Sequence, residues 1–171
     1  QKGALRSGRT DDHQDWHDAN IGFYSTALGH NSRASATCSF AHGDSAYAQS
    51  EYAVAIGFQT YANAIGAVAI GKQCHASAEY STVSGGWSNH AEAQKATIAG
   101  GINNKAYGDY SVISGGAANI TYDRQNFIGC GWFNTCRGEV STISGGQLNQ
   151  ITNSNCGYAT IGGGKQNTIN A

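Results

Sequence analysis

The sequence predicts an all-β protein, a parallel β-solenoid of ten short coils, and two observations lead to this prediction. The first is a recurring glycine, whose spacing is fourteen in the early part of the chain, then fifteen, and finally eighteen at the last step. The second is a set of columns with constant side-chain character at fixed distances from these glycines. A repeat of this length, sustained over most of a chain, is typical of a solenoid. We call the ten recurring residues the anchor glycines: Gly29, Gly43, Gly57, Gly71, Gly86, Gly101, Gly116, Gly131, Gly146 and Gly164.

Each coil is predicted to contain two short strands. The segment Val54–Gly57 alternates with a period of two, which is the pattern of a strand with one face inward. The anchor glycine then permits a turn with positive φ or a close approach of two backbones. A small residue three positions later and an alanine two positions after that, as at Thr60 and Ala62, predict the second strand. Equivalent residues of successive coils then lie about 4.8 Å apart.

The strand before each anchor glycine defines a further column. We align Val54 and Val68 of the early coils with Val83 and Ile98 of the later coils, because each lies three residues before its anchor glycine. Branched side chains of this kind suit a pleated, half-buried surface.

The repeat divides the 171 residues into two parts. Residues 1–20 do not fit it and are expected to form an N-terminal cap or neck, whereas residues 21–171 are expected to form the repeat domain. The repeat length is fourteen up to about residue 78 and fifteen after it, where the pattern becomes Gly-Gly-x-x-Asn. The longer last spacing predicts a three-residue insertion between Ile151 and Tyr158, and insertions in solenoids often map to the functional face.

An asparagine follows the anchor glycine by three residues in every later coil. Two structural roles are open: a ladder of hydrogen-bonded amides along the rod, or a turn with left-handed backbone geometry. A row of ligand-binding amides is the alternative to both. The column comprises Asn89, Asn104, Asn119, Asn134, Asn149 and Asn167.

The composition argues against several classes of protein. With 24 glycines, no proline, no methionine and 12% charged residues, the chain has few large side chains for a globular core. The regular columns argue against disorder. The net charge of −1 and the lack of a basic patch speak against nucleic-acid binding, and no apolar run approaches the roughly 20 residues of a membrane span. We therefore expect neither nucleic-acid binding nor membrane insertion.

The cysteines and histidines match no metal or redox motif. The five cysteines, whose number is odd, are expected to fill small buried spaces and not to form a disulfide framework. His13 and His17 have the spacing of one helical turn among several aspartates, which leaves a metal site conceivable, but a solvated polar segment is the favoured interpretation. We expect no metal, no cofactor and no catalytic residues.

The segments Ala53–Gly57 and Ala67–Gly71 resemble the head repeats of YadA-like trimeric autotransporter adhesins. This resemblance implies a left-handed parallel β-roll that assembles side by side as a homotrimer. Later coils, such as Thr142–Asn149, look like a variant of the same roll that is familiar in phage and large-virus fibres. Cysteines outside disulfides fit assembly in a reducing cytosol, and the stalk and anchor of an autotransporter are absent from this sequence, so the viral comparison is preferred.

The predicted function is that of a non-enzymatic trimeric fibre or head segment that presents a receptor-binding surface outside the cell. A phage or viral tail fibre is the first expectation, with a cell-surface glycan or protein as the receptor. The alternatives are the head of a bacterial surface adhesin, a purely structural extracellular filament, and a trimeric fibre with a polysaccharide hydrolase site between chains.

Aromatic residues on the turns are the candidate receptor contacts. Stacking of the coils should place Trp87, Ile102, Ala117 and Trp132 in one column along the rod. Such a column either packs against a neighbouring chain of the trimer or is exposed for contact with a glycan or protein. The candidate contacts are Trp87, Trp132, Phe133, Phe58, Tyr107 and Tyr110.

Overall fold

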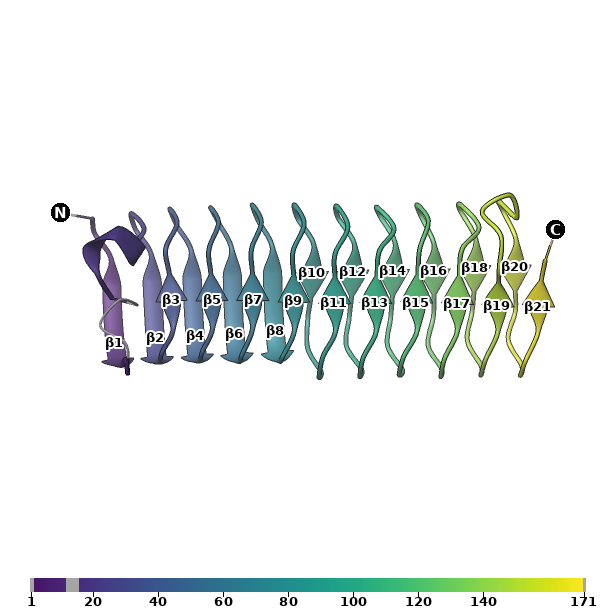
Figure 1. The fold of residues 1–171 in the computed structure, drawn as a ribbon, viewed down its shortest axis with the longest axis horizontal. Coiled ribbons are helices and arrows are strands. Elements are labelled where there is room, and N and C mark those ends of the chain that lie inside the picture. The colour runs from purple at the N-terminus through teal and green to yellow at the C-terminus, as the bar shows by residue number, and fades with distance from the viewer. Residues whose placement is uncertain (1, 12–15, 171) are drawn as a thin grey trace.

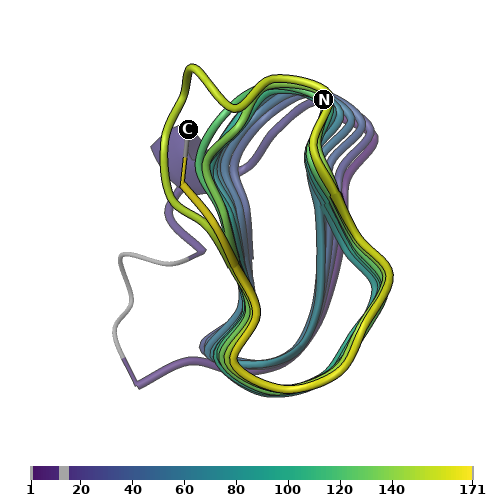
Figure 2. The same cartoon turned by 90° about the vertical axis from the view of Figure 1, so that its right-hand side faces the viewer.

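The computed structural model describes residues 2–11 and 16–170 and is a straight rod of stacked coils (Figure 1). Viewed along its axis, the rod is a closed loop with two long sides and two rounded edges (Figure 2). All strands pair in parallel, each with the equivalent strand of the next coil. The described residues contain no helix beyond the single 3₁₀ turn η1, Asp18–Asn20. The predicted all-β solenoid of about ten coils is thereby confirmed.

One long side is an eleven-stranded sheet, the larger sheet. Its strands contain five residues in the early coils and two in the later coils. They are β1 Leu5–Arg9, β2 Thr26–His30, β4 Phe40–Asp44, β6 Val54–Phe58, β8 Val68–Lys72, β10 Thr82–Val83, β12 Thr97–Ile98, β14 Val112–Ile113, β16 Phe127–Ile128, β18 Thr142–Ile143 and β20 Thr160–Ile161.

The other long side is a ten-stranded sheet, the smaller sheet, in which every strand has two residues. Each strand directs its first side chain outward and its second inward. The strands are β3 Arg33–Ala34, β5 Tyr47–Ala48, β7 Tyr61–Ala62, β9 His75–Ala76, β11 His90–Ala91, β13 Lys105–Ala106, β15 Ile120–Thr121, β17 Thr135–Cys136, β19 Gln150–Ile151 and β21 Thr168–Ile169.

The strand register corrects one alignment made from the sequence. Ala69 of β8 pairs with Val83 of β10, and Val68 pairs with Thr82. The column that joins Val68 to Val83 is therefore wrong by one residue, because the extra residue of each later coil lies between the strand and the anchor glycine. In β6 and β8 the residues before the anchor glycine are all apolar, so the sequence there could not reveal which side chains point inward.

The interior changes along the rod as a result. In the early coils alanines from both sheets, such as Ala55 and Ala62, fill the core and have no exposed surface. In the later coils a column of fully buried isoleucines replaces one set of alanines, as at Ile98 and Ile113. The bulky side chains of the early strands, such as Val54, point outward and are half-buried.

The anchor glycines mark the closest approach of neighbouring coils. Gly101 has a φ of 96°, and a Cβ on this residue would collide with the backbone of Gly116 in the next coil. The preceding Gly100 lacks positive φ, and a Cβ there would meet no atom within 4 Å. The two glycines of a Gly-Gly pair thus have different roles, and only the anchor is required by geometry.

The asparagine column forms a ladder of hydrogen bonds inside the rod. The backbone N–H of Asn134 donates to Oδ1 of Asn119 at 3.0 Å. The Nδ2 of Asn119 donates to the carbonyls of Gly115 and Gly131 at 3.0 and 2.9 Å. The left-handed backbone geometry belongs instead to the residue before each asparagine, such as Ala118 with a φ of 55°, so the turn interpretation of this column is wrong.

The N-terminal segment takes part in the solenoid, although its sequence does not fit the repeat. Strand β1 pairs with β2, and Gly8 lies beside Gly29 at the anchor position. Arg6 occupies the inward position of β1 and donates to the carbonyl of Ala34 at 2.7 Å and to Oγ of Ser25 at 2.9 Å. We infer that this segment caps the N-terminal end of the core, where the polar Arg6 replaces the alanine of the next coil.

Candidate functional site

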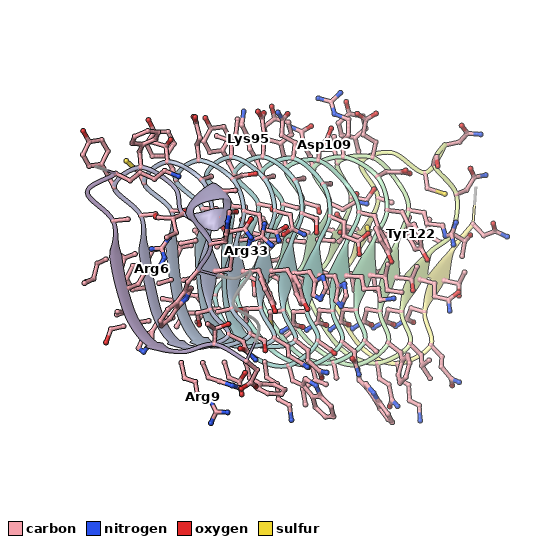
Figure 3. The ribbon with its side chains drawn as sticks, turned by 60° about the vertical axis from the view of Figure 1, so that its left-hand side comes forward. Arg6, Arg9, Arg33, Lys95, Asp109 and Tyr122 are labelled. Carbon is pink, nitrogen blue, oxygen red and sulfur yellow. The ribbon has the colours of Figure 1, made fainter. Side chains whose placement is uncertain are left out.

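The two edges of the rod carry most of its exposed aromatic side chains. The glycine edge comprises each anchor glycine and the two residues after it, such as Gly86–Ser88. The tyrosine edge comprises the turn that leads from the smaller sheet back to the larger sheet, such as Glu92–Lys95. Figure 3 shows side chains that project from both edges, with Lys95 and Asp109 on the tyrosine edge and Arg9 on the opposite one.

The glycine edge carries the column that was expected from the sequence. Trp87, Ile102, Ala117 and Trp132 follow one another in parallel bridges along the rod. Their backbone pairing continues N-terminally to Lys72, which pairs with Phe58 in β6. This column adds a third ladder to the two sheets.

The aromatic residues of the glycine edge form two clusters. In the first, the ammonium of Lys72 lies 5.9 Å from the ring centroid of Phe58 and 5.3 Å from that of Trp87. In the second, the rings of Trp132 and Phe133 lie 5.1 Å apart. Trp87 is 47% exposed and Trp132 is 52% exposed in the single chain. Both clusters can therefore contact either a ligand or another chain.

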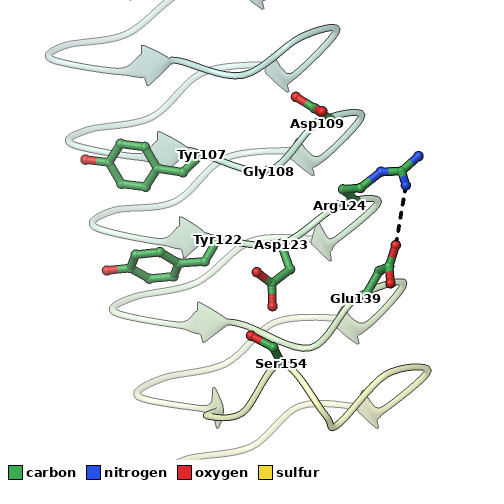
Figure 4. A pocket seen from close by; sticks show the side chains of 8 residues that line it. All are labelled: Tyr107, Gly108, Asp109, Tyr122, Asp123, Arg124, Glu139 and Ser154. Carbon is green, nitrogen blue, oxygen red and sulfur yellow. Dashed lines mark ion pairs between the residues drawn. The ribbon is translucent and has the colours of Figure 1, made fainter.

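Tyr107 helps to form a hollow of about 370 Å³ beside the tyrosine edge (Figure 4). Its ring and that of Tyr122 are 5.7 Å apart and lie on one side, while Asp109, Arg124 and Glu139 lie on the other. Arg124 pairs with Glu139 at 3.7 Å.

The predicted insertion reaches this hollow. Eight residues separate β19 from β20, whereas five separate the equivalent strands β13 and β14. The three additional residues bring Ser154 to the border of the hollow. The insertion thus lies at the border of a concave surface on the outside of the rod.

Tyr110 lies apart from the hollow, in a column that the sequence reasoning did not identify. It has a φ of 58° and is the outermost residue of its turn on the tyrosine edge. Other exposed tyrosines occupy the same position in other coils, with φ between 54° and 62°, and these are Tyr24, Tyr52, Tyr80 and Tyr158. The alternating pairs Glu51–Tyr52, Glu79–Tyr80 and Asp109–Tyr110 were the signal in the sequence.

A stacked aromatic column also runs along the outer face of the smaller sheet. The rings of Tyr47 and Tyr61 lie 5.2 Å apart, and those of His75 and His90 lie 4.5 Å apart and nearly parallel. Burial, together with the neighbouring His90, lowers the pKa of His75 below its ordinary value. This column borders a second hollow of about 360 Å³.

The cysteines correct another expectation. None of the five, all of which lie in the described part of the chain, forms a disulfide, but Cys38 and Cys130 are exposed and are not buried fillers. Cys38 lies at the outermost position of the tyrosine edge, and Cys130 replaces the first glycine of a Gly-Gly pair, where a side chain meets open space. The other three are buried, and burial raises the pKa of Cys136 to about 12.

Only one member of the proposed histidine pair lies among the described residues. His13 lies outside the described residues, and His17 is exposed. Within residues 2–11 and 16–170, no group of three or more histidines, cysteines, aspartates and glutamates is placed to hold a metal ion. The same residues include no helix that is both long and apolar enough to cross a membrane.

The fold and its exposed columns define a β-solenoid that displays side chains along a rigid rod. Residues 21–46, 39–60 and 48–73 match the model of the YadA head domain repeat, which contains two copies of the repeat. The chain therefore carries YadA-like head repeats over residues 21–73, the region of the shorter coils. Such repeats indicate an adhesin-like head that is displayed outside the cell. No curated protein matches the chain.

Proposed function

We propose that the chain is a non-enzymatic, trimeric head or fibre segment that presents a receptor-binding surface. The observation that supports this function most directly is the exposed aromatic column of the glycine edge on a rod whose coils pair from one to the next. A rigid support holds the aromatic side chains in place and lowers the entropic cost of binding a partner. Large exposed apolar patches are characteristic of interaction sites.

The outward side of the larger sheet supports the trimer. Its early strands direct a set of half-buried apolar side chains away from the core, which we call the outer aliphatic face, and the exposed His42 lies between Leu28 and Ile56 in one of its columns. Two further copies of the chain would cover this face, since single soluble proteins seldom leave such patches open. The face comprises Leu28, Phe40, Val54, Ile56, Val68 and Ile70.

Charge placed on the outer aliphatic face tests the trimer. We expect Ile56→Asp to yield monomers, because a carboxylate buried between chains costs several kcal/mol. Ser84→Asp is the matched control, since Ser84 is exposed in the same column but lies in a later coil outside this face. A trimer that survives Ile56→Asp would show that the chains do not meet here.

Two settings remain candidates for the head. The five cysteines, none of which forms a disulfide, favour a virion tail fibre that assembles in a reducing compartment, which is our first candidate. The match to the YadA head domain repeat favours a bacterial surface adhesin, which is the second. Immunolabelling of the source cells and of virions released from them separates these settings.

Substitution of the exposed tryptophans tests receptor binding. We expect Trp87→Ala and Trp132→Ala to weaken binding to glycan arrays or receptor-bearing cells by about tenfold or more, with the trimer intact. Ala117→Ser is the control in the same column. If the tryptophan variants fall to monomers, the column is a seam between chains and the contact proposal is wrong.

A further inference from the structure

The tyrosine edge carries a regular row of aromatic rings. Tyr24, Tyr52, Tyr80 and Tyr110 occupy the same corner of every second coil. Because strands in a sheet lie about 4.8 Å apart, successive members of the row are about 9.6 Å apart along the axis. Their exposed fractions range from 72% at Tyr24 to 42% at Tyr110. We call these four residues the tyrosine row.

The rings of the row lie back over the preceding coil. A Cβ built on Gly66 would lie 2.6 Å from Cδ1 of Tyr80, so the ring of Tyr80 covers this glycine. The ring of Tyr24 lies over Gly3 in the same way, at 3.1 Å. The ammonium of Lys95 lies 4.9 Å from the ring centroid of Tyr110 and 3.3 Å from its hydroxyl. Each of these rings thus packs against the rod on one side and leaves another side open to a ligand.

A carboxylate precedes three of the four tyrosines. These acids are Glu51, Glu79 and Asp109, and they repeat with the same two-coil period. Gln94 fixes two of them, because its Nε2 donates to Glu79 at 3.0 Å and its backbone N–H donates to Asp109 at 3.0 Å. Lys95, at the corner of the coil between Tyr80 and Tyr110, and Lys2, beside Tyr24, offset two of these three charges. The row therefore presents aromatic rings and hydrogen-bond acceptors with a net negative charge.

The chemistry of the row identifies a class of ligand. The C–H groups of a sugar ring are attracted to the electron-rich face of an aromatic ring, and sugar hydroxyls donate to carboxylates. An extended β-1,4-linked chain turns alternate sugars to the same side. The length of its disaccharide repeat is close to the axial distance between successive tyrosines of the row. Acidic polysaccharides would be repelled by the carboxylates.

We propose that the tyrosine row binds a neutral, extended polysaccharide that lies parallel to the rod. This inference rests on the proposed receptor-binding function and adds to it a second contact surface, on the edge opposite the tryptophans, with a ligand class of its own. The row spans six coil steps, or about 29 Å, so a chain of six sugars is enough to cover it.

Calorimetric titration of the purified chain tests the row. The probes are β-1,4-linked oligomers of glucose and of N-acetylglucosamine with two, four and six rings. We expect affinity to rise with each added pair of rings, since each pair reaches one more tyrosine. Tyr80→Ala should weaken binding of the six-ring probe by about two- to tenfold, the range for a single aromatic contact, whereas Tyr80→Phe should retain it.

Tyr158→Ala is the matched control. Tyr158 occupies the same corner and is 83% exposed, but it lies three coil steps beyond Tyr110 and therefore outside the two-coil period. We expect its substitution to leave the affinity unchanged. Tyr52→Ala replaces Tyr80→Ala if the latter does not fold, as judged by circular dichroism and mass in solution.

Several results would overturn the inference. These are an affinity that does not depend on probe length, an equal loss in Tyr158→Ala and Tyr80→Ala, or no binding of either probe series. If receptor-bearing cells still bind the chain in such a case, the proposed function stands and the tyrosine row alone is excluded. If a polyuronate binds as tightly as the neutral probes, the assigned ligand class is wrong.

Discussion

At the scale of single residues, the two kinds of glycine in the later coils have unequal importance. Gly101 combines positive φ with close backbone contact to the next coil, whereas its neighbour Gly100 has neither. The sequence identified Gly101 through its spacing, but spacing alone cannot distinguish a required glycine from a tolerated one.

Substitution of these two glycines tests the difference. We expect Gly101→Ala to lower the free energy of unfolding by about 2–4 kcal/mol, since the methyl group collides with backbone and strains φ. Gly100→Ala should change it by less than about 1 kcal/mol. Urea denaturation followed by circular dichroism measures both, and equal losses would contradict the assigned roles.

The asparagine ladder also depends on single polar atoms. Asn119 is fully buried, and its side chain acts both as donor and as acceptor. We expect Asn119→Asp to destabilise the rod by about 3–5 kcal/mol, because the new carboxylate loses the hydrogen bonds that Nδ2 donates and buries a charge next to carbonyl oxygens. Asn103→Asp is the control, since Asn103 is exposed in the equivalent turn of the preceding coil. A small effect in the urea midpoint of Asn119→Asp would show that the ladder contributes little.

At the scale of strands, the sequence predicted the two strands of each coil but not the direction of every side chain. Segments such as Ala53–Gly57 are apolar at each position, so either set of alternate side chains could have faced the core. The narrow space between the sheets decides which side chains of these early strands point inward, since alanines fit inside and the larger valines and isoleucines point outward. The tyrosine row escaped the sequence reasoning because Cys38, Gly66 and Lys95 interrupt its column.

The outer column of the smaller sheet leads to a prediction about pH. The ordinary histidine pKa is near 6.5, and the pKa of His75 is lowered by burial and by His90, against a smaller opposing influence of Glu92. The unfolded chain therefore takes up a proton first as the pH falls. The contribution of neutral His75 to the free energy of unfolding is therefore complete above about pH 6.5. It is lost as the pH falls from there through the lowered pKa that His75 has in the folded chain.

Replacement of His75 by the residue of the two preceding coils tests this effect. Tyr47 and Tyr61 hold the equivalent positions, so His75→Tyr continues the stacked column without a group that titrates in this range. We expect the urea midpoint of the natural chain to decrease when the pH is lowered from about 7.5 to about 5.5, and that of His75→Tyr to decrease less. Identical falls would show that His75 does not cause the acid sensitivity.

At the scale of the whole molecule, the ten coils form one rod whose strands pair from end to end. The repeat made this architecture predictable, because a single coil cannot bury its own apolar face and stacked neighbours share a thin core. The exposed edges of the rod consist of residues that vary from coil to coil. The repeat does not predict how these residues lie relative to one another, so the structure was needed to place them. The glycine-edge column followed from a constant offset in the sequence, whereas the hollow at Tyr107 combines residues of successive coils with Ser154, which the insertion brings close.

The mass of the chain in solution tests the central claim most directly. One chain has a mass of 17.8 kDa. Since the outer aliphatic face is proposed to be covered by two further copies, sedimentation equilibrium should give three times this mass across the accessible concentration range. A single species with the mass of one chain would contradict the trimer, and the outer aliphatic face would then need another explanation.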